Sequence, residues 1–149
     1  MKLTNTHNMK RKSGMTLLEL TVVILVLLSL ISILFIGARA WKKGSDRSAS
    51  ILTIRNVQQA VRSFANMNGK TEGVAGQVAV TDLFGTGKFM QNNPTAGIHP
   101  GGAGLAYEIA APTVIPEVGT LYLTVTGSAT SDATPASYYM PEAGKFSDW

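Results

Sequence analysis

The sequence contains no cysteine among its 149 residues, which excludes disulfide bonds, thiolate nucleophiles and cysteine metal sites. Histidine is nearly absent as well, with only His7 and His99. Two histidines without cysteine are too few for a zinc site, and no metal site is predicted from them. Ser131 and Asp132 have no histidine nearby in the sequence to complete a catalytic triad. We therefore predict that the protein is not an enzyme.

A cluster of basic residues that could bind nucleic acid is also lacking. The pI is about 9.5, and 13 basic residues stand against 9 acidic ones. Four of the basic residues lie in the first 14 positions, which hold no acidic residue, and the remainder of the chain is balanced. Binding to phosphates requires lysine and arginine gathered on one surface. We predict no nucleic-acid partner and interpret the N-terminal basic residues as the flank of a membrane segment.

The sequence does contain one long apolar run, over residues 15–36, in which Glu19 is the only charged residue. At about 1.5 Å per helical residue the run is roughly 33 Å long, enough to cross a hydrocarbon core of roughly 30 Å. A chain this small could hardly cover so long a helix that is apolar on all sides. We predict a single transmembrane helix. Basic residues flank it at both ends, so charge alone does not give its orientation.

Glu19 is the informative residue of this run because an ionised carboxylate in hydrocarbon is unfavourable. It lies one turn into the run, where its side chain could reach the hydrated interface. Alternatively, it requires a cationic partner. A free α-amino group on a neighbouring chain would serve if the chain were cut just before Met15. Because an unpaired buried charge is costly, such pairing would fix the axial register between subunits.

The residues around this point form a recognisable pattern, in which a short basic stretch and a glycine precede an apolar segment with an acidic fifth residue: KRKSG followed by MTLLE. With this pattern and the apolar run to Ile36, the chain resembles the type IV pilin and type II secretion pseudopilin family. The resemblance implies a pilin-like α+β fold and a leader, residues 1–14, that a prepilin peptidase removes between Gly14 and Met15. It also implies N-methylation of Met15 and a role for Glu19 in assembly and register.

The same resemblance implies a location and partners. The peptidase reads its site on the cytoplasmic side, so the chain would be a single-pass protein of the bacterial inner membrane with a cytoplasmic N-terminus. Its partners would be copies of itself and related minor pilins in a pilus or a periplasmic filament, together with the peptidase and an inner-membrane assembly platform. Two features of the sequence depart from the pattern of this family. Met15 occupies a position where phenylalanine is commonest, and no proline interrupts the helix, which leaves Gly37, Ser29 and Ser32 as its weaker points.

Three alternatives remain open at this stage. The chain could be a pseudopilin of a secretion system, or a membrane-tethered binding domain that never polymerises. A secretory signal peptide cut at Ala38-Arg39-Ala40 is the third. The apolar run is longer than the usual 7–15 residues of a signal peptide and carries Glu19 inside it, which argues against the third.

The segment 37–69 continues as an amphipathic helix. Apolar residues recur at helical spacing and predict one buried face: Ile51, Ile54, Val57, Val61 and Phe64. Gln58 and Gln59 lie largely off this face. Asn68-Gly69 is a typical C-terminal stop. We predict one long helix that ends near Asn68, with Gly37 or Gly44 as places where it could bend.

Residues 70–149 predict a small globular domain with an antiparallel sheet of three or four strands packed on that helical face. The segments 104–110 and 120–126 alternate well, and 137–140 and 77–80 are weaker candidates. His99 is expected in a loop, followed by a glycine-rich turn. No cofactor is predicted. Calcium, which major pseudopilins bind in a C-terminal loop, stays open because Asp132, Glu142 and Asp148 could supply oxygens, although their spacing forms no recognisable site.

Overall fold

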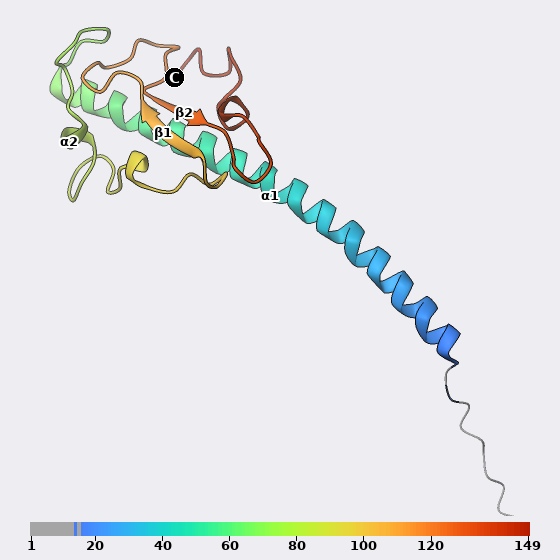
Figure 1. The fold of residues 1–149 in the computed structure, drawn as a ribbon. Coiled ribbons are helices and arrows are strands. Elements are labelled where there is room, and N and C mark those ends of the chain that lie inside the picture. The colour runs from blue at the N-terminus through green and yellow to red at the C-terminus, as the bar shows by residue number, and fades with distance from the viewer. Residues whose placement is uncertain (1–13, 15) are drawn as a thin grey trace, which may run out of the picture. The chain divides into compact units, whose positions relative to one another are not determined.

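The computed structural model describes residue 14 and residues 16–149 (Figure 1). Two compact units make up the chain, Met1–Ala40 and Trp41–Trp149, and we call the second unit the head. Residues 1–13 of the predicted leader and Met15, the predicted cleavage and methylation residue, lie outside the described residues.

The helix α1 runs from Leu17 to Asn68 without a break, as the sequence predicts for one long helix. Gly37 and Gly44, where the sequence would allow a bend, are both helical. Gly69 follows the last helical residue with φ of 59°, in the left-handed region where glycine commonly ends a helix. The predicted end of the helix is therefore confirmed.

The head is built on the second half of α1. Ile54, Val57 and Val61 are fully buried and Phe64 is nearly so, which confirms the predicted apolar face, although Ile51 is only half-buried. These side chains join residues from the rest of the head in one apolar core, whose largest members are Leu83, Phe84, Leu105, Tyr107, Ile115, Leu121, Tyr122, Leu123 and Tyr139.

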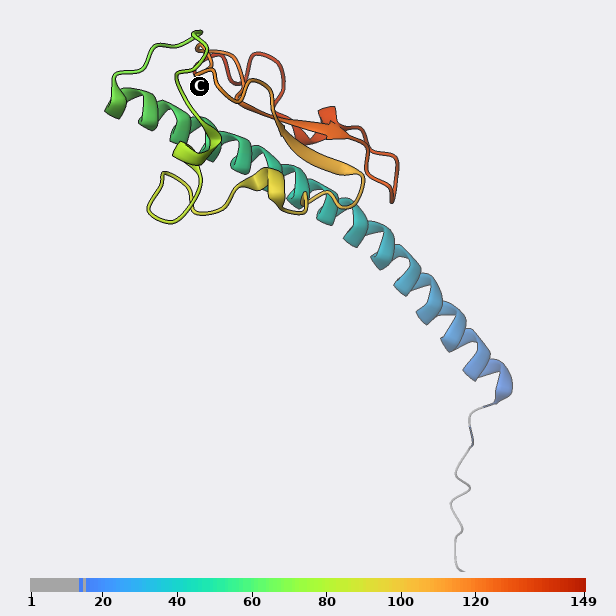
Figure 2. The ribbon, with the colours of Figure 1, turned by 60° about the vertical axis from the view of Figure 1, so that its left-hand side comes forward.

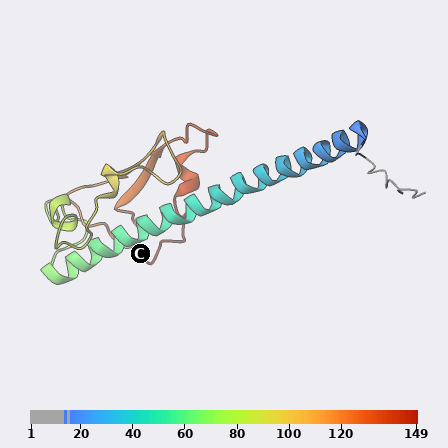
Figure 3. The ribbon, with the colours of Figure 1, turned by 90° about the horizontal axis from the view of Figure 1, so that it is seen from below.

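The sheet of the head consists of β1 (Leu105–Ile109) and β2 (Leu123–Gly127), paired antiparallel with Tyr107 opposite Val125. Figures 2 and 3 show both strands on one side of α1. Leu105 and Tyr107 face the core and Ala106 and Glu108 face solvent, as expected for a sheet with one buried side. The predicted α+β class is confirmed: a long apolar N-terminal helix and a small antiparallel sheet.

The number of strands differs from the prediction of three or four, since the sheet has two in the described part of the chain. The third candidate, 137–140, is instead the 3₁₀ helix η2 (Ala136–Tyr139), which follows Pro135. In this turn Tyr139 enters the core, and Tyr138 lies beside basic side chains of α1. In a flat strand, these two adjacent side chains would point to opposite faces.

Two further short helices lie between α1 and β1. The candidate strand 77–80 leads into the one-turn helix α2 (Val80–Leu83), where the Asp82 carboxylate accepts a hydrogen bond from the Ala79 N–H. A second 3₁₀ helix, η1 (Pro94–Ala96), follows an asparagine whose side chain accepts from the main chain of Thr95. At 77–80, local capping outweighs weak strand propensity.

Gln58 is buried, contrary to its predicted position off the core face. Its Nε2 donates to the Thr120 carbonyl at 2.9 Å, and its Oε1 accepts from the Tyr122 N–H at 2.9 Å. The amide thus takes main-chain groups that a neighbouring strand would otherwise take, and β2 begins only at Leu123 instead of at residue 120. Spacing alone did not reveal this contact because a polar side chain can be buried when both its donor and its acceptor are satisfied.

Candidate assembly site at the start of the apolar helix

The first turn of α1 is closed by its own side chains. Glu19 Oε2 accepts hydrogen bonds from the Thr16 main-chain N–H at 2.7 Å and from the Thr16 hydroxyl at 3.0 Å. The Thr16 hydroxyl oxygen in turn accepts from the Glu19 N–H at 3.3 Å. This reciprocal arrangement is a capping box, which satisfies donors that the helix itself leaves without partners.

Neither interpretation of Glu19 from the sequence, as a residue at the hydrated interface or as one paired with a cation, predicted this capping box. The Glu19 carboxylate folds back toward the helix N-terminus, where the helix dipole favours negative charge. Both bonds use Oε2, and Oε1 accepts no hydrogen bond from any residue that the structure describes. Within the described part of the chain, Oε1 is therefore the carboxylate oxygen without a donor. The signal was present in the sequence as Thr-x-x-Glu ahead of an apolar run.

Gly14 is exposed, and nothing lies within 4 Å of the place where a Cβ would stand on it. The neighbouring Met15 falls outside the described residues, so the geometry of the predicted cleavage site between Gly14 and Met15 is not described. Thr16 and Glu19 are the residues of the motif that the structure brings together.

Beyond the first turn, α1 presents an uncovered apolar surface. Every leucine, isoleucine, valine and phenylalanine of residues 17–36 is exposed, by between 47 and 81 %. Burying a side chain of this kind contributes about 1.5–3 kcal/mol, so leaving the segment in water would cost on the order of 20 kcal/mol. A domain's whole net stability is about 5–15 kcal/mol. The segment therefore requires a non-aqueous environment, and α1 is long and apolar enough to cross a membrane.

The polar residues within this segment are satisfied by the helix itself. The Thr21 hydroxyl donates to the Leu18 carbonyl at 2.9 Å, and the Ser32 hydroxyl donates to the Leu28 carbonyl at 2.8 Å. The Ser29 hydroxyl bonds to carbonyls of the preceding turn in the same way. These bonds remove the cost of placing hydroxyl groups in hydrocarbon. Glu19 is the only formally charged side chain in residues 17–36.

His99 lies in a loop as expected, but it is buried, with 2 % of its surface exposed. Its Nε2 lies 3.0 Å from the Ser50 hydroxyl, and its Nδ1 accepts from the Gly101 N–H at 3.0 Å. The rings of Tyr107 and Tyr139 lie with their centroids 4.6 and 5.1 Å from the imidazole. Burial lowers the pKa of His99. The residue joins the loop to α1 as a neutral imidazole, a role that its position in the sequence did not indicate.

The three carboxylates considered for calcium do not converge. Asp132 pairs with Lys43 at 3.1 Å and Glu142 pairs with Arg47 at 3.2 Å. Hydrogen bonding by Thr134 and the nearby Lys43 lowers the pKa of Asp132. Residue 14 and residues 16–149 contain no group of three histidine, aspartate or glutamate side chains placed to hold a metal ion. Cations of α1 neutralise two of the three carboxylates.

The candidate site is thus a capped, acidic helix start that leads into an exposed apolar surface. Its geometry suits lateral packing against other helices, with one carboxylate oxygen left for a cation. Comparison with protein-family models, with curated proteins and with solved structures finds no match to this chain.

Proposed function

We propose that this chain is a structural subunit of a type IV pilus-like filament, made as a prepilin in the bacterial inner membrane. The observation that carries the proposal is the Glu19 carboxylate, which stands at the start of a helix whose next turns expose mainly apolar side chains and no other charged one. A prepilin peptidase would remove residues 1–14, cutting after Gly14, and methylate the new amino group of Met15.

Glu19 then has two functions in the proposal. Oε2 caps its own helix through Thr16, and Oε1 accepts a hydrogen bond from the Met15 ammonium of the adjacent subunit. A charge-assisted bond of this kind is strong where water is excluded. Because Glu19 and Met15 lie four residues apart, pairing between chains would shift adjacent helices by about 6 Å along their axes.

The transfer of residues 17–36 from lipid into a bundle of like helices is nearly neutral in hydrophobic terms, because lipid tails and leucine side chains are similarly apolar. Close packing, and pairing of a carboxylate that is costly to leave alone, must then favour assembly. The continuous helix supplies the packing surface, and the head gives the filament its exterior. A secretion pseudopilin would use the same helix in a shorter, periplasmic filament.

Mass spectrometry of the mature N-terminus tests this proposal. Chains purified from cells that contain a prepilin peptidase should begin at a methylated Met15. In cells that lack the peptidase, the same chain should retain residues 1–14. A mature chain that begins at Trp41 would instead mean that a signal peptidase removed the whole apolar segment, and the proposal would be wrong.

A further inference from the structure

Residues 141–149 form a strap across the second half of α1, and they contain neither strand nor α-helix. Two hydrogen bonds within the strap close local turns, one from Lys145 N–H to Glu142 O and one from Trp149 N–H to Phe146 O. In the described part of the chain, one main-chain bond joins the strap to another segment, from Gly119 N–H to Trp149 O at 3.4 Å. Sheet or helix pairing therefore does not hold the strap in place.

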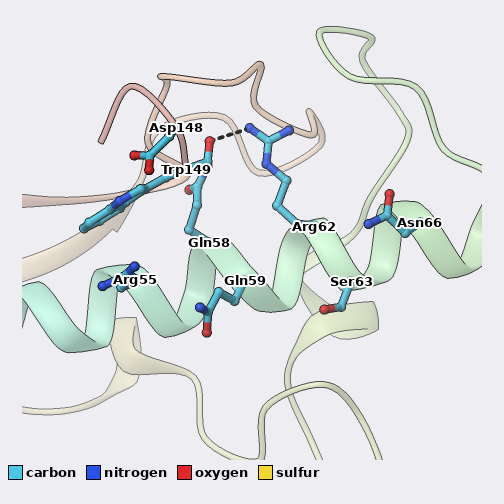
Figure 4. A pocket seen from close by; sticks show the side chains of 8 residues that line it. All are labelled: Arg55, Gln58, Gln59, Arg62, Ser63, Asn66, Asp148 and Trp149. Carbon is cyan, nitrogen blue, oxygen red and sulfur yellow. Dashed lines mark hydrogen bonds between the residues drawn. The ribbon is translucent and has the colours of Figure 1, made fainter. Parts of the chain in front are cut away.

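Three basic side chains of α1 hold it, together with partial packing of Phe146 and Trp149 against the core. Near one end, Arg47 Nη2 lies 3.2 Å from Glu142 Oε1. At the other end, Arg62 Nη2 donates to the Trp149 main-chain oxygen at 2.9 Å, and the Arg55 guanidinium lies 5.3 Å from the centre of the Trp149 ring. Figure 4 shows Arg55, Arg62 and Trp149 on the same side of the helix.

Between these two attachments the strap is loosely packed. A hollow of about 310 Å³ lies between α1, at Arg47, Ser48 and Ile51, and the strap, at Pro141 and Lys145. A second hollow, of about 420 Å³, lies at the second attachment, beside Trp149. Pro141, the first residue of the strap, is buried, whereas Glu142 and Lys145 are exposed and Phe146 and Trp149 are only partly buried against the core.

We propose that the strap is a clasp that opens as a unit while the rest of the head stays folded. Exposed ion pairs contribute little stability, and segments with few buried contacts open at a lower free energy than the core. Opening would release Glu142 and Trp149 and expose the face of α1 around Ile51. This behaviour belongs to the head and does not depend on whether the chain assembles into a filament.

Trypsin reports on the clasp because Lys145 lies within it and cleavage there releases residues 146–149. The full-length chain in detergent micelles would be digested briefly, and the loss of these four residues would be followed by mass spectrometry. The variant Glu142→Gln removes one attachment at constant side-chain size. The matched control is Glu108→Gln, because the exposed Glu108 side chain pairs with no cation among the residues that the structure describes.

Glu142→Gln should speed cleavage after Lys145 by about two- to fivefold, the range expected for loss of one exposed ion pair when cleavage follows the open population. Raising the salt concentration should speed cleavage of the unsubstituted chain and narrow this difference. The thermal midpoint of the head should match that of the control. The clasp would be ruled out if both variants were cut at the same rate, or if cleavage had the same denaturant dependence as unfolding of the whole head.

Discussion

Gln58 joins α1 to the sheet through both ends of its amide. The variant Gln58→Ala would leave the buried Tyr122 N–H and the part-buried Thr120 carbonyl without their partner. A buried group left without its partner costs about 1–3 kcal/mol, and water can replace the partner at the more exposed Thr120. We expect the free energy of unfolding of the head to fall by about 1–3 kcal/mol. Denaturant titration followed by tryptophan and tyrosine fluorescence would measure it.

Gln59 provides the control because it has the same side chain one residue later and is exposed. Gln59→Ala should change the free energy of unfolding by less than about 0.5 kcal/mol. Equal effects of the two substitutions would mean that the Gln58 amide makes no special contribution to stability.

His99 makes the head sensitive to acid. Burial lowers the pKa of His99 below its ordinary value, and the carboxylate of Asp46 opposes that effect more weakly. The unfolded chain therefore binds a proton more readily than the folded head does. Stability is complete above the ordinary histidine pKa of about 6.5 and is lost as the pH falls below it. Protonation at Nδ1 would also oppose the Gly101 N–H that now donates to it.

Denaturant titrations between pH 7.5 and 5 would test this expectation. The free energy of unfolding should fall with pH in the unsubstituted chain and fall much less in His99→Gln, which cannot titrate. Because the substitution also disturbs packing against Tyr107 and Tyr139, the comparison concerns the pH slopes and not the absolute stabilities. Parallel slopes would exclude His99 as the titrating group.

The start of α1 is stabilised by an interaction between two side chains. Thr16→Val removes the hydroxyl that bonds with both the carboxylate and the N–H of Glu19, whereas Thr16→Ser keeps it. Loss of such a cap costs about 0.5–2 kcal/mol. We expect faster hydrogen exchange of the first-turn amides in the valine variant than in the serine variant, measured in micelles. Equal exchange in both variants would mean that the hydroxyl does not stabilise the turn.

The elements differ in how well the sequence predicted them. The long helix was predictable because an apolar run, an amphipathic stripe and Asn68-Gly69 all agree along the chain. The strands β1 and β2 were predictable because their alternation is strong. The segment at η2 was not, because the contacts of Tyr138 and Tyr139 with distant parts of the chain decide its conformation.

The candidate site was predictable to a similar extent. Glu19 is conspicuous because charge is rare in an apolar run, and its sequence position is sufficient to single it out. The capping bond from Thr16 could have been inferred from the Thr-x-x-Glu spacing. The burial of Gln58 and His99 depends on partners 49 to 64 residues away in the chain, and local pattern cannot reveal such contacts.

The whole molecule combines an apolar helical segment, exposed along its length, with a head that has its own core. We propose that a membrane covers the apolar segment before assembly and that copies of the same segment cover it afterwards. The proposed pairing of Glu19 with Met15 sets a definite offset between neighbours. With that offset, Val26 of one subunit lies at the level of Val22 of the next, each seven residues beyond the paired groups and on the same helical face.

Disulfide formation between two singly substituted chains tests this register directly, since the natural sequence has no cysteine to interfere. Val22→Cys and Val26→Cys chains would be expressed together in cells that process and assemble them, then oxidised. The proposal predicts crosslinked dimers when both chains are present, few with either alone, and loss of the dimers when both also carry Glu19→Gln. Dimers that persist undiminished with Glu19→Gln would contradict the claim that this carboxylate sets the packing of neighbouring subunits.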